Sequence, residues 1–283
     1  MTDALTIAAY ALRESLRRRV FVVVALLTIA FLVLYRVGAG KAFEETENAF
    51  PPVGVEPDEF IGSTLLGMAM FATLFLGTVL AVFLTLGAVR GDAERGLLQP
   101  LVVRPVGRTT FLLGRFLGAA AVCAVYVALV YATAVVLTGE AGGWWPDRLV
   151  APAAELAGAV VLLVAISLLG SVFLSATTNG IAVFMLFGAG LVGGLLGQIG
   201  EAIDSKTLLT VSERTSWALP FEALYQDGLQ RLTLDARGLT RFAVELGPFG
   251  GGQSYGAWLP VWSIGYLAVV LGLAAWGFAC RDL

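Results

Sequence analysis

The chain has 283 residues, of which 58% are apolar and 14% are charged, and its formal net charge is −3. An ordinary soluble domain is about half apolar and about a quarter charged, so a mean hydropathy of +0.85 excludes a soluble globular protein and indicates a membrane protein. The absence of histidine excludes Ser-His-Asp and Cys-His catalysis, histidine-ligated metals and histidine proton relays.

The N-terminal segment predicts an amphipathic helix over residues 2–19. Its apolar residues recur at helical spacing: Leu5, Ala9, Leu12 and Leu16. Three arginines, Arg17–Arg19, stand at its end, and no small-x-small cleavage site follows the next apolar run. These features argue against a cleaved signal peptide. We expect the helix to lie flat at the membrane surface before the first span.

Six long apolar runs predict six transmembrane helices in a single all-α, polytopic domain over 1–283. The runs cover residues 20–36, 61–89, 110–137, 150–177, 181–199 and 258–279. A bilayer core of about 30 Å needs roughly 20 apolar residues, and the short first run is extended by snorkelling of Arg36. Residues 200–257 then form a long extracytoplasmic loop.

The distribution of charge predicts the orientation of these spans. With six spans, both termini lie on one side, together with the loop between the second and third spans. This side carries ten basic and five acidic residues, whereas the opposite side carries eight basic and sixteen acidic residues. Because cytoplasmic loops carry an excess of Lys and Arg, we expect both termini of this multi-pass plasma-membrane protein to be cytoplasmic.

The loop between the second and third spans is rich in arginine: Arg90, Arg95, Arg104, Arg108 and Arg115. The positive-inside rule explains these charges but not the apolar residues among them. Those residues follow a short helical pattern: Leu97, Leu98, Leu101 and Val102. We expect a cytoplasmic amphipathic helix over 93–103, whose apolar face suits docking into a groove on a partner protein.

Three motifs of this loop stand out: Glu94-Arg95-Gly96-Leu97-Leu98, Arg104-Pro105-Val106-Gly107-Arg108 and Leu113-Gly114-Arg115. Together they resemble the signature of ABC type 2 transporter permeases, which typically show Glu-x-Gly-Thr-Leu, then Pro-Val-Ser-Arg, then a Gly-Lys pair that opens the third span. The chain departs from this pattern at Leu97, Gly107 and Arg115, and Pro100 is unusual. The amphipathic N-terminal helix and the six-span plan also fit, so the resemblance covers essentially the whole chain.

The resemblance implies that the chain is the permease subunit of an ATP-driven ABC transporter, an exporter, and not itself an enzyme. In this family two permeases pair as a homodimer or heterodimer, and each contacts a separate ATP-binding subunit. ATP and Mg would bind to that partner and no cofactor to this chain, which lacks a G-x-x-x-x-G-K-[ST] loop. Membrane lipids complete the expected partners, and nucleic acid is not among them.

The resemblance also makes the loop a coupling element that contacts the ATP-binding subunit. The expected contact residues are Glu94, Gly96, Leu97, Leu98, Leu101, Arg104, Pro105 and Arg108. Glu94 and Arg108 would make polar contacts, and the leucines would form an apolar footprint. Helix capping and lipid-headgroup binding are the competing roles for each of these residues.

The fifth predicted span contains two overlapping small-xxx-small repeats: Gly190, Gly193, Gly194 and Gly197. Such glycines allow close helix packing inside lipid, either between two permease subunits or within one chain. In the loop that follows, a proline at a helix start and an apolar face predict a short helix over 219–229 at the outer membrane surface. The face consists of Phe221, Leu224, Tyr225, Leu229 and Leu232.

The predicted spans carry almost no Asp, Glu, Lys or Arg, and none of these residues occurs in 61–89, 116–137, 156–199 or 258–279. An ion-coupled secondary transporter, the main alternative, usually keeps a charge at mid-membrane despite a cost of about 2.5–3.5 kcal/mol. A lipid-modifying membrane enzyme would need clustered carboxylates, whereas Glu155 and Glu201 are scattered in the sequence. A polar cluster at mid-membrane would contradict the permease interpretation.

Overall fold

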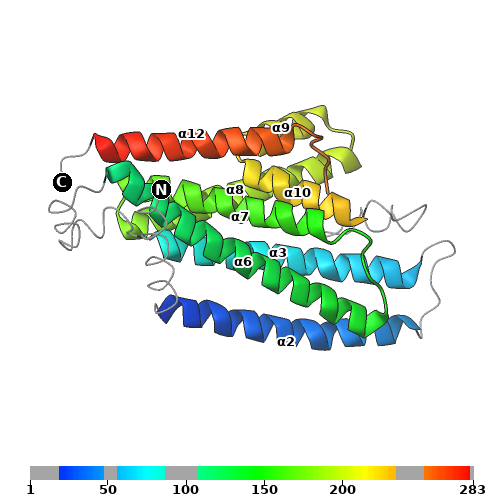
Figure 1. Cartoon of the computed structure of the whole chain (residues 1–283). Coiled ribbons are helices and arrows are strands. Elements are labelled where there is room, and N and C mark those ends of the chain that lie inside the picture. The colour runs from blue at the N-terminus through cyan, green and yellow to red at the C-terminus, as the bar shows by residue number, and fades with distance from the viewer. Residues whose placement is uncertain (1–18, 48–55, 87–106, 234–251, 281–283) are drawn as a thin grey trace.

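The structure is a computed structural model that describes residues 19–47, 56–86, 107–233 and 252–280. Within these residues every regular element is a helix (Figure 1): α2 (Arg19–Glu47), α3 (Pro57–Thr85), α6 (Arg108–Gly142), α7 (Val150–Phe173), α8 (Ala176–Ala202), α9 (Lys206–Ala218), α10 (Pro220–Thr233) and α12 (Leu259–Ala279). The predicted all-α class is confirmed. The predicted cytoplasmic helix 93–103 lies outside the described residues, as does the predicted helix 2–19 apart from its last residue.

Six helices of the described part are long and apolar enough to cross a membrane: α2, α3, α6, α7, α8 and α12. They match the six predicted apolar runs in order. The first and third extend further than hydropathy suggests, because α2 continues to Glu47 and α6 to Gly142. The ring of Phe43 on α2 packs onto Gly142, where a larger residue would clash, so this contact supports both extensions beyond the apolar runs.

The helices form a layered bundle with α2 along one edge and α12 along the opposite edge (Figure 1). Between them, α7 occupies the centre and contacts α3, α6, α8, α10 and α12. The central position of α7 follows from its composition, since apolar residues occupy nearly its whole circumference and several are completely buried: Leu156, Ala159, Val160 and Leu163. A helix that is apolar all round is expected in the interior of a bundle.

Two hydrogen bonds between hydroxyl groups tie the edge helix α2 to α6. The Thr28 and Tyr126 hydroxyl oxygens lie 2.6 Å apart, and the same distance joins the hydroxyls of Tyr35 and Thr138. In lipid no hydrophobic effect drives helices together, so packing and interhelical hydrogen bonds of this kind contribute to their association. They fix the position of α2, which has few other neighbours.

Most tryptophans mark one end of the bundle, where α2 ends and α12 begins. Five of the six lie in the loop after α6, at the end of α9 or at the start of α12: Trp144, Trp145, Trp217, Trp258 and Trp262. Tryptophan is enriched at membrane–water interfaces. We call this the outer end, after the expected topology, and the opposite end, where α6 begins and α12 ends, the inner end.

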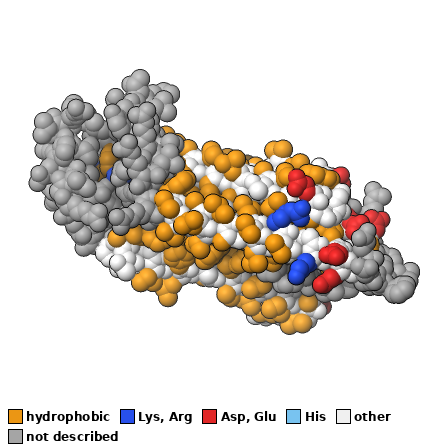
Figure 2. Space-filling view, turned by 90° about the horizontal axis from the view of Figure 1, so that it is seen from below, with side chains coloured by type: hydrophobic (Ala, Val, Ile, Leu, Met, Phe, Trp, Pro, Cys, Tyr) orange, Lys and Arg blue, Asp and Glu red, His pale blue; other side chains and the backbone are white. Residues whose placement is uncertain are grey.

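Exposed apolar side chains cover the sides of the bundle between the two ends. They include Val22, Leu26 and Leu34 on α2, Ile181, Met185 and Val192 on α8, and Val261, Ile264 and Val269 on α12. Figure 2 shows that apolar side chains cover the middle of one such face, whereas its visible charged side chains gather toward one end. This distribution is the one required of a surface in contact with lipid tails.

Candidate functional site

Arg108 is the only predicted coupling residue that the structure describes; Glu94, Gly96, Leu97, Leu98, Leu101, Arg104 and Pro105 lie outside the described residues. Arg108 begins α6 at the inner end. Its Nη1 donates to the carbonyl oxygens of Phe278 at 3.4 Å and Ala279 at 3.1 Å. These carbonyls belong to the last turn of α12, where a cation satisfies free acceptors and complements the helix dipole.

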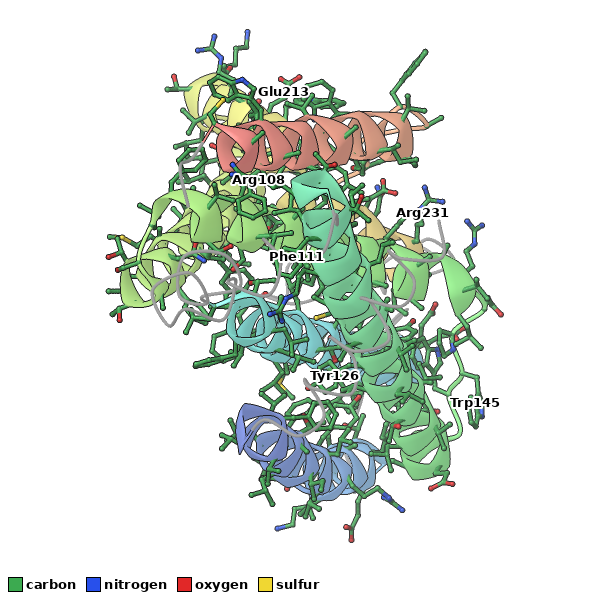
Figure 3. The ribbon with its side chains drawn as sticks, turned by 60° about the vertical axis from the view of Figure 1, so that its left-hand side comes forward. Arg108, Phe111, Tyr126, Trp145, Glu213 and Arg231 are labelled. Carbon is green, nitrogen blue, oxygen red and sulfur yellow. The ribbon has the colours of Figure 1, made fainter. Side chains whose placement is uncertain are left out.

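Aromatic packing reinforces this contact at the inner end. The rings of Phe111 on α6 and Phe278 on α12 lie 6.3 Å apart between centroids, and the guanidinium of Arg115 lies 5.5 Å from the Phe111 centroid. Figure 3 shows Arg108 and Phe111 side by side where α6 meets the end of α12. The ring of Phe173, from the end of α7, packs onto Gly277. The inner ends of α6, α7 and α12 therefore form one packed joint.

The four glycines predicted for helix packing lie on a single face of α8, and all are buried. Gly190 faces the ring of Phe221 on α10, and Gly193 faces Thr215 on α9. A Cβ atom added at either position would clash with these neighbours. The glycine face of α8 is therefore covered by helices of the same chain.

The other two glycines face polar side chains. A Cβ at Gly194 would collide with Glu222 and Gln226 of α10, and one at Gly197 would lie 2.5 Å from Ser212 Oγ on α9 and from Gln253 Nε2. The glycines thus allow polar groups of three different segments to approach the backbone of α8.

The helix predicted over 219–229 is present as α10, and it is covered by other helices of the bundle. Every residue from Pro220 to Leu229 is buried. The predicted apolar face is buried in the bundle, with α7 as its main neighbour, but α8, α9 and α12 contact the helix as well. Helical periodicity identified the apolar face, whereas the burial of the polar face depends on helices that are distant in sequence.

Arg231 joins α10 to α7 through a pair of carboxylates at the outer end. Its Nε lies 2.6 Å from Glu155 Oε1 and 2.8 Å from Asp227 Oδ2. The other oxygen of Asp227 accepts a hydrogen bond from the backbone N–H of Tyr255 at 3.2 Å. Glu155 and Asp227, which are distant in the sequence, therefore lie together around Arg231. Because Glu155 lies in the second turn of α7, this cluster sits near the outer end rather than at the middle of the span.

A second polar cluster connects α8, α9 and α10 with the segment that leads into α12. The Tyr255 hydroxyl lies 2.8 Å from Ser216 Oγ and 3.0 Å from Gln253 Oε1. Gln253 Nε2 donates to Glu201 Oε1 at 3.2 Å, at the end of α8. Burial is the main cause that raises the pKa of the Tyr255 phenol to about 12. Trp262 of α12 adds a hydrogen bond from Nε1 to the Trp217 carbonyl at 3.0 Å.

Glu222 of α10 lies against Gly194 of α8 and is completely buried. Gln226 Nε2 donates to Glu222 Oε1 at 2.8 Å. Burial is the main cause that raises the pKa of the Glu222 carboxyl, to about 7, while the hydrogen bond from Gln226 lowers it. In the described part of the chain, no group of three or more Asp, Glu, Cys or His side chains could hold a metal ion.

Comparison with protein families decides the class of the molecule. Residues 5–283 match a family described as ABC-2 family transporter protein. The chain belongs to this family. No curated protein compared with it gives a significant match. The resemblance seen in the Glu94–Arg115 motifs is confirmed, and the match extends over nearly the whole chain.

Membership identifies the chain as the membrane component of an ABC-2 transporter. Permeases of this family lack ATPase activity, so the prediction that the chain is not an ATPase is confirmed, and the family implies a partner subunit that binds ATP. The multi-pass membrane character is likewise supported by the six candidate spans. The two outer polar clusters do not contradict the permease interpretation, since they lie near one end of an ABC-2 membrane component.

Sequence reasoning missed the buried polar residues of this ABC-2 protein. Glu222, Gln226 and Asp227 fall in a segment of low mean hydropathy between two spans, which predicts solvent exposure. One signal was present: Glu222 and Gln226, like Asp227 and Arg231, are spaced i, i+4, so their side chains pair along one helix. The pairing with Glu155 has no local signature, because the two segments are more than 60 residues apart.

Proposed function

We propose that the chain is the permease subunit of an ATP-driven exporter in the plasma membrane. Two such permeases pair, as a homodimer or heterodimer, and each binds one ATP-binding subunit that carries ATP and Mg. The family match over residues 5–283 carries this proposal. The described part supports it through six candidate spans and apolar faces suited to membrane lipids.

The segment 91–108 is the proposed coupling element. It ends at Arg108, which the structure joins to the last turn of α12. A push on this segment by the ATP-binding subunit would therefore reach α6 through the backbone and α12 through the Arg108 contact. Both helices run to the outer end, so the inner joint offers a direct mechanical route across the membrane.

The proposed orientation places both termini and the coupling segment in the cytoplasm. The excess of arginine in the segments at the inner end supports this orientation. The tryptophans of the outer end fit the opposite interface, although they do not choose between the two sides of the membrane. With this orientation, α9, α10 and the segment 252–258 close the outer end of the bundle.

The exposed surface of the spans is mostly apolar, and this favours a hydrophobic or amphipathic cargo that passes between two permease subunits. A strongly charged cargo would need compensating charges along its path. Within the described residues, the buried ionisable groups of α7 and α10 are confined to the outer end. They would meet a cargo only as it leaves.

Co-purification tests this proposal directly. The tagged chain is expressed with its candidate ATP-binding subunit, and wild type is compared with a Glu94→Arg, Leu98→Asp double variant. We expect the wild type to retain the subunit in mild detergent and the variant to lose it while inserting normally into the membrane. If neither chain retains an ATP-binding subunit, the proposed energy source is wrong.

A further inference from the structure

The carboxyl group of Glu222 occupies an unusual position between α10 and α8. Its side chain is completely excluded from solvent and lies against Gly194. Gln226 Nε2 donates to Oε1 at 2.8 Å. The second oxygen, Oε2, is buried and has no hydrogen-bond partner among the described residues, and the same holds for Gln226 Oε1 and Ser212 Oγ nearby.

No described cation compensates a charge at this position. Arg231 of the same helix is bonded to Glu155 and Asp227, and Arg214 on α9 is exposed. Lys206, at the start of α9, is exposed as well. The other ionisable groups on the elements around α10 are acids or phenols: Glu155 on α7, Glu201 on α8, Glu213 on α9, Tyr255 before α12, Tyr266 on α12, and Asp58 and Glu59 at the start of α3. None of these acids and phenols supplies a positive charge that would compensate a carboxylate at Glu222.

An ionised carboxylate needs several donors or a cation when it is buried, because its lost hydration must be replaced. Glu222 receives one amide hydrogen bond. A neutral carboxylic acid avoids the charge penalty and carries an O–H that can donate. The raised pKa of Glu222, caused first by burial, points in the same direction.

We propose that Glu222 is a proton-binding site: a bound proton holds α10 against the glycine face of α8, and its release loosens this contact. On release, the proton leaves the carboxylic acid for water at the outer end, and a carboxylate remains. The charged form is stabilised only if α10 moves and admits water or a cation to Oε2. The proton site itself is argued from the structure alone. The inference rests on the proposed function only where it takes α10 to cover the outer end of the transport path.

Infrared spectroscopy of the purified permease tests whether the proton is bound. The carbonyl stretch of a buried carboxylic acid is separate from the bands of carboxylates. We expect an acid band at pH 6 with a component that is lost as the pH rises to about 8, and we expect Glu222→Gln to remove this component. The matched control is Glu213→Gln, which removes an exposed carboxyl of α9 and should leave the band unchanged.

Thiol labelling tests whether loss of the proton moves α10. Ala223 is buried next to Glu222, and Ala223→Cys is introduced together with Cys280→Ser, which removes the exposed native thiol. Thiolate formation raises labelling with pH in every variant, so the comparison is made at one pH with and without Glu222→Gln. At pH 8.5 we expect maleimide labelling to be at least fivefold slower when Glu222→Gln is included, and no difference at pH 6.

Equal labelling in both backgrounds at pH 8.5, or an acid band at pH 6 that Glu222→Gln leaves unchanged, would overturn the inference. So would protection at pH 8.5 that depends on Na⁺ or K⁺, because the occupant would then be a metal cation and not a proton. Both measurements use the permease alone. Their failure is therefore distinguishable from failure of the chain to bind an ATP-binding subunit.

Discussion

Arg108, the first residue of α6, donates a hydrogen bond of 3.1 Å to the carbonyl oxygen of Ala279, the last residue of α12. The two residues are 171 positions apart in the sequence. The segment proposed to bind the ATP-binding subunit ends at Arg108, so this contact connects the site where energy would enter to the last membrane span. Arg108 therefore caps the C-terminal end of α12. The sequence pattern left helix capping open as an alternative to contact with the partner.

Replacing Arg108 should loosen the end of α12. A cation at a helix C-terminus contributes about 0.3–1 kcal/mol, so Arg108→Gln should speed amide hydrogen exchange in the last turn of α12 by about two- to fivefold. Arg108→Lys keeps the charge and should change exchange less. Mass spectrometry of hydrogen exchange gives the measurement. If Arg108→Gln instead releases the ATP-binding subunit and leaves exchange in α12 unchanged, direct contact with the partner is its main role.

Gly194 should not tolerate a side chain. A Cβ there would collide with Glu222 and Gln226, and overpacking of this kind typically costs about 1–3 kcal/mol. We therefore expect Gly194→Ala to lower the thermal unfolding temperature in detergent. The matched control is Gly188→Ala on the same helix, where a Cβ meets nothing within 4 Å and alanine favours the helix by up to about 1 kcal/mol. Equal destabilisation by both variants would contradict the packing described here.

Arg231 should couple energetically to Glu155. Loss of one partner of a buried ion pair costs about 3–5 kcal/mol, but the Arg231 side chain is 33% exposed, so we expect about 2 kcal/mol for Arg231→Gln. A double-mutant cycle with Glu155→Gln should give a coupling energy of at least about 0.5 kcal/mol. Arg214→Gln, on the exposed side of α9, serves as the control. Additive effects of the two substitutions would show that the pair is not formed.

Glu222 should make the stability of the permease depend on pH. The pKa of Glu222 is raised from 4.5 to about 7 in the folded chain, so between these values the folded state binds more protons than the unfolded state. Its contribution to stability is therefore complete below about pH 4.5 and is lost as the pH rises to about 7.

Glu222→Gln removes the titration of this carboxyl. The difference in stability between the variant and wild type therefore reports Glu222 alone, because all other titratable groups are shared. We expect the variant to gain stability relative to wild type as the pH rises from 5 to 8, by an amount on the order of 3 kcal/mol. The difference should then stay constant up to pH 8.5. Thermal unfolding across this pH range measures it. A constant difference from pH 5 to 8.5 would show that Glu222 has an ordinary pKa.

The six membrane spans could be predicted from the sequence. The packing of α9 and α10 over their outer end could not. Six apolar runs predicted six membrane helices because length and hydropathy alone decide whether a helix can cross a bilayer. The extension of α2 is accompanied by a tertiary contact, Phe43 on Gly142, which hydropathy does not encode. The glycines of α8 predicted close packing but not the partner, which is α9 and α10 of the same chain.

The burial of the polar residues of α10 could not be predicted from the sequence either. Glu222 and Asp227 resemble surface residues of an amphipathic helix, since periodicity reports only that one face is apolar. Their burial results from α8, α9 and the segment before α12, which close over the polar face. The coupling motifs could be found in the sequence because their spacing is local. Their contact with an ATP-binding subunit stays a prediction.

In the proposed mechanism, nucleotide on the ATP-binding subunit moves the outer end of this permease. Val150 and Trp258 are exposed at the outer starts of α7 and α12, so cysteines there, with Cys280→Ser, carry spin labels for distance measurement in the assembled complex. We predict that trapping with ADP and vanadate shifts the distance distribution, and that no shift occurs with Glu94→Arg and Leu98→Asp. Identical distributions in the intact complex with and without trapped nucleotide would contradict the account.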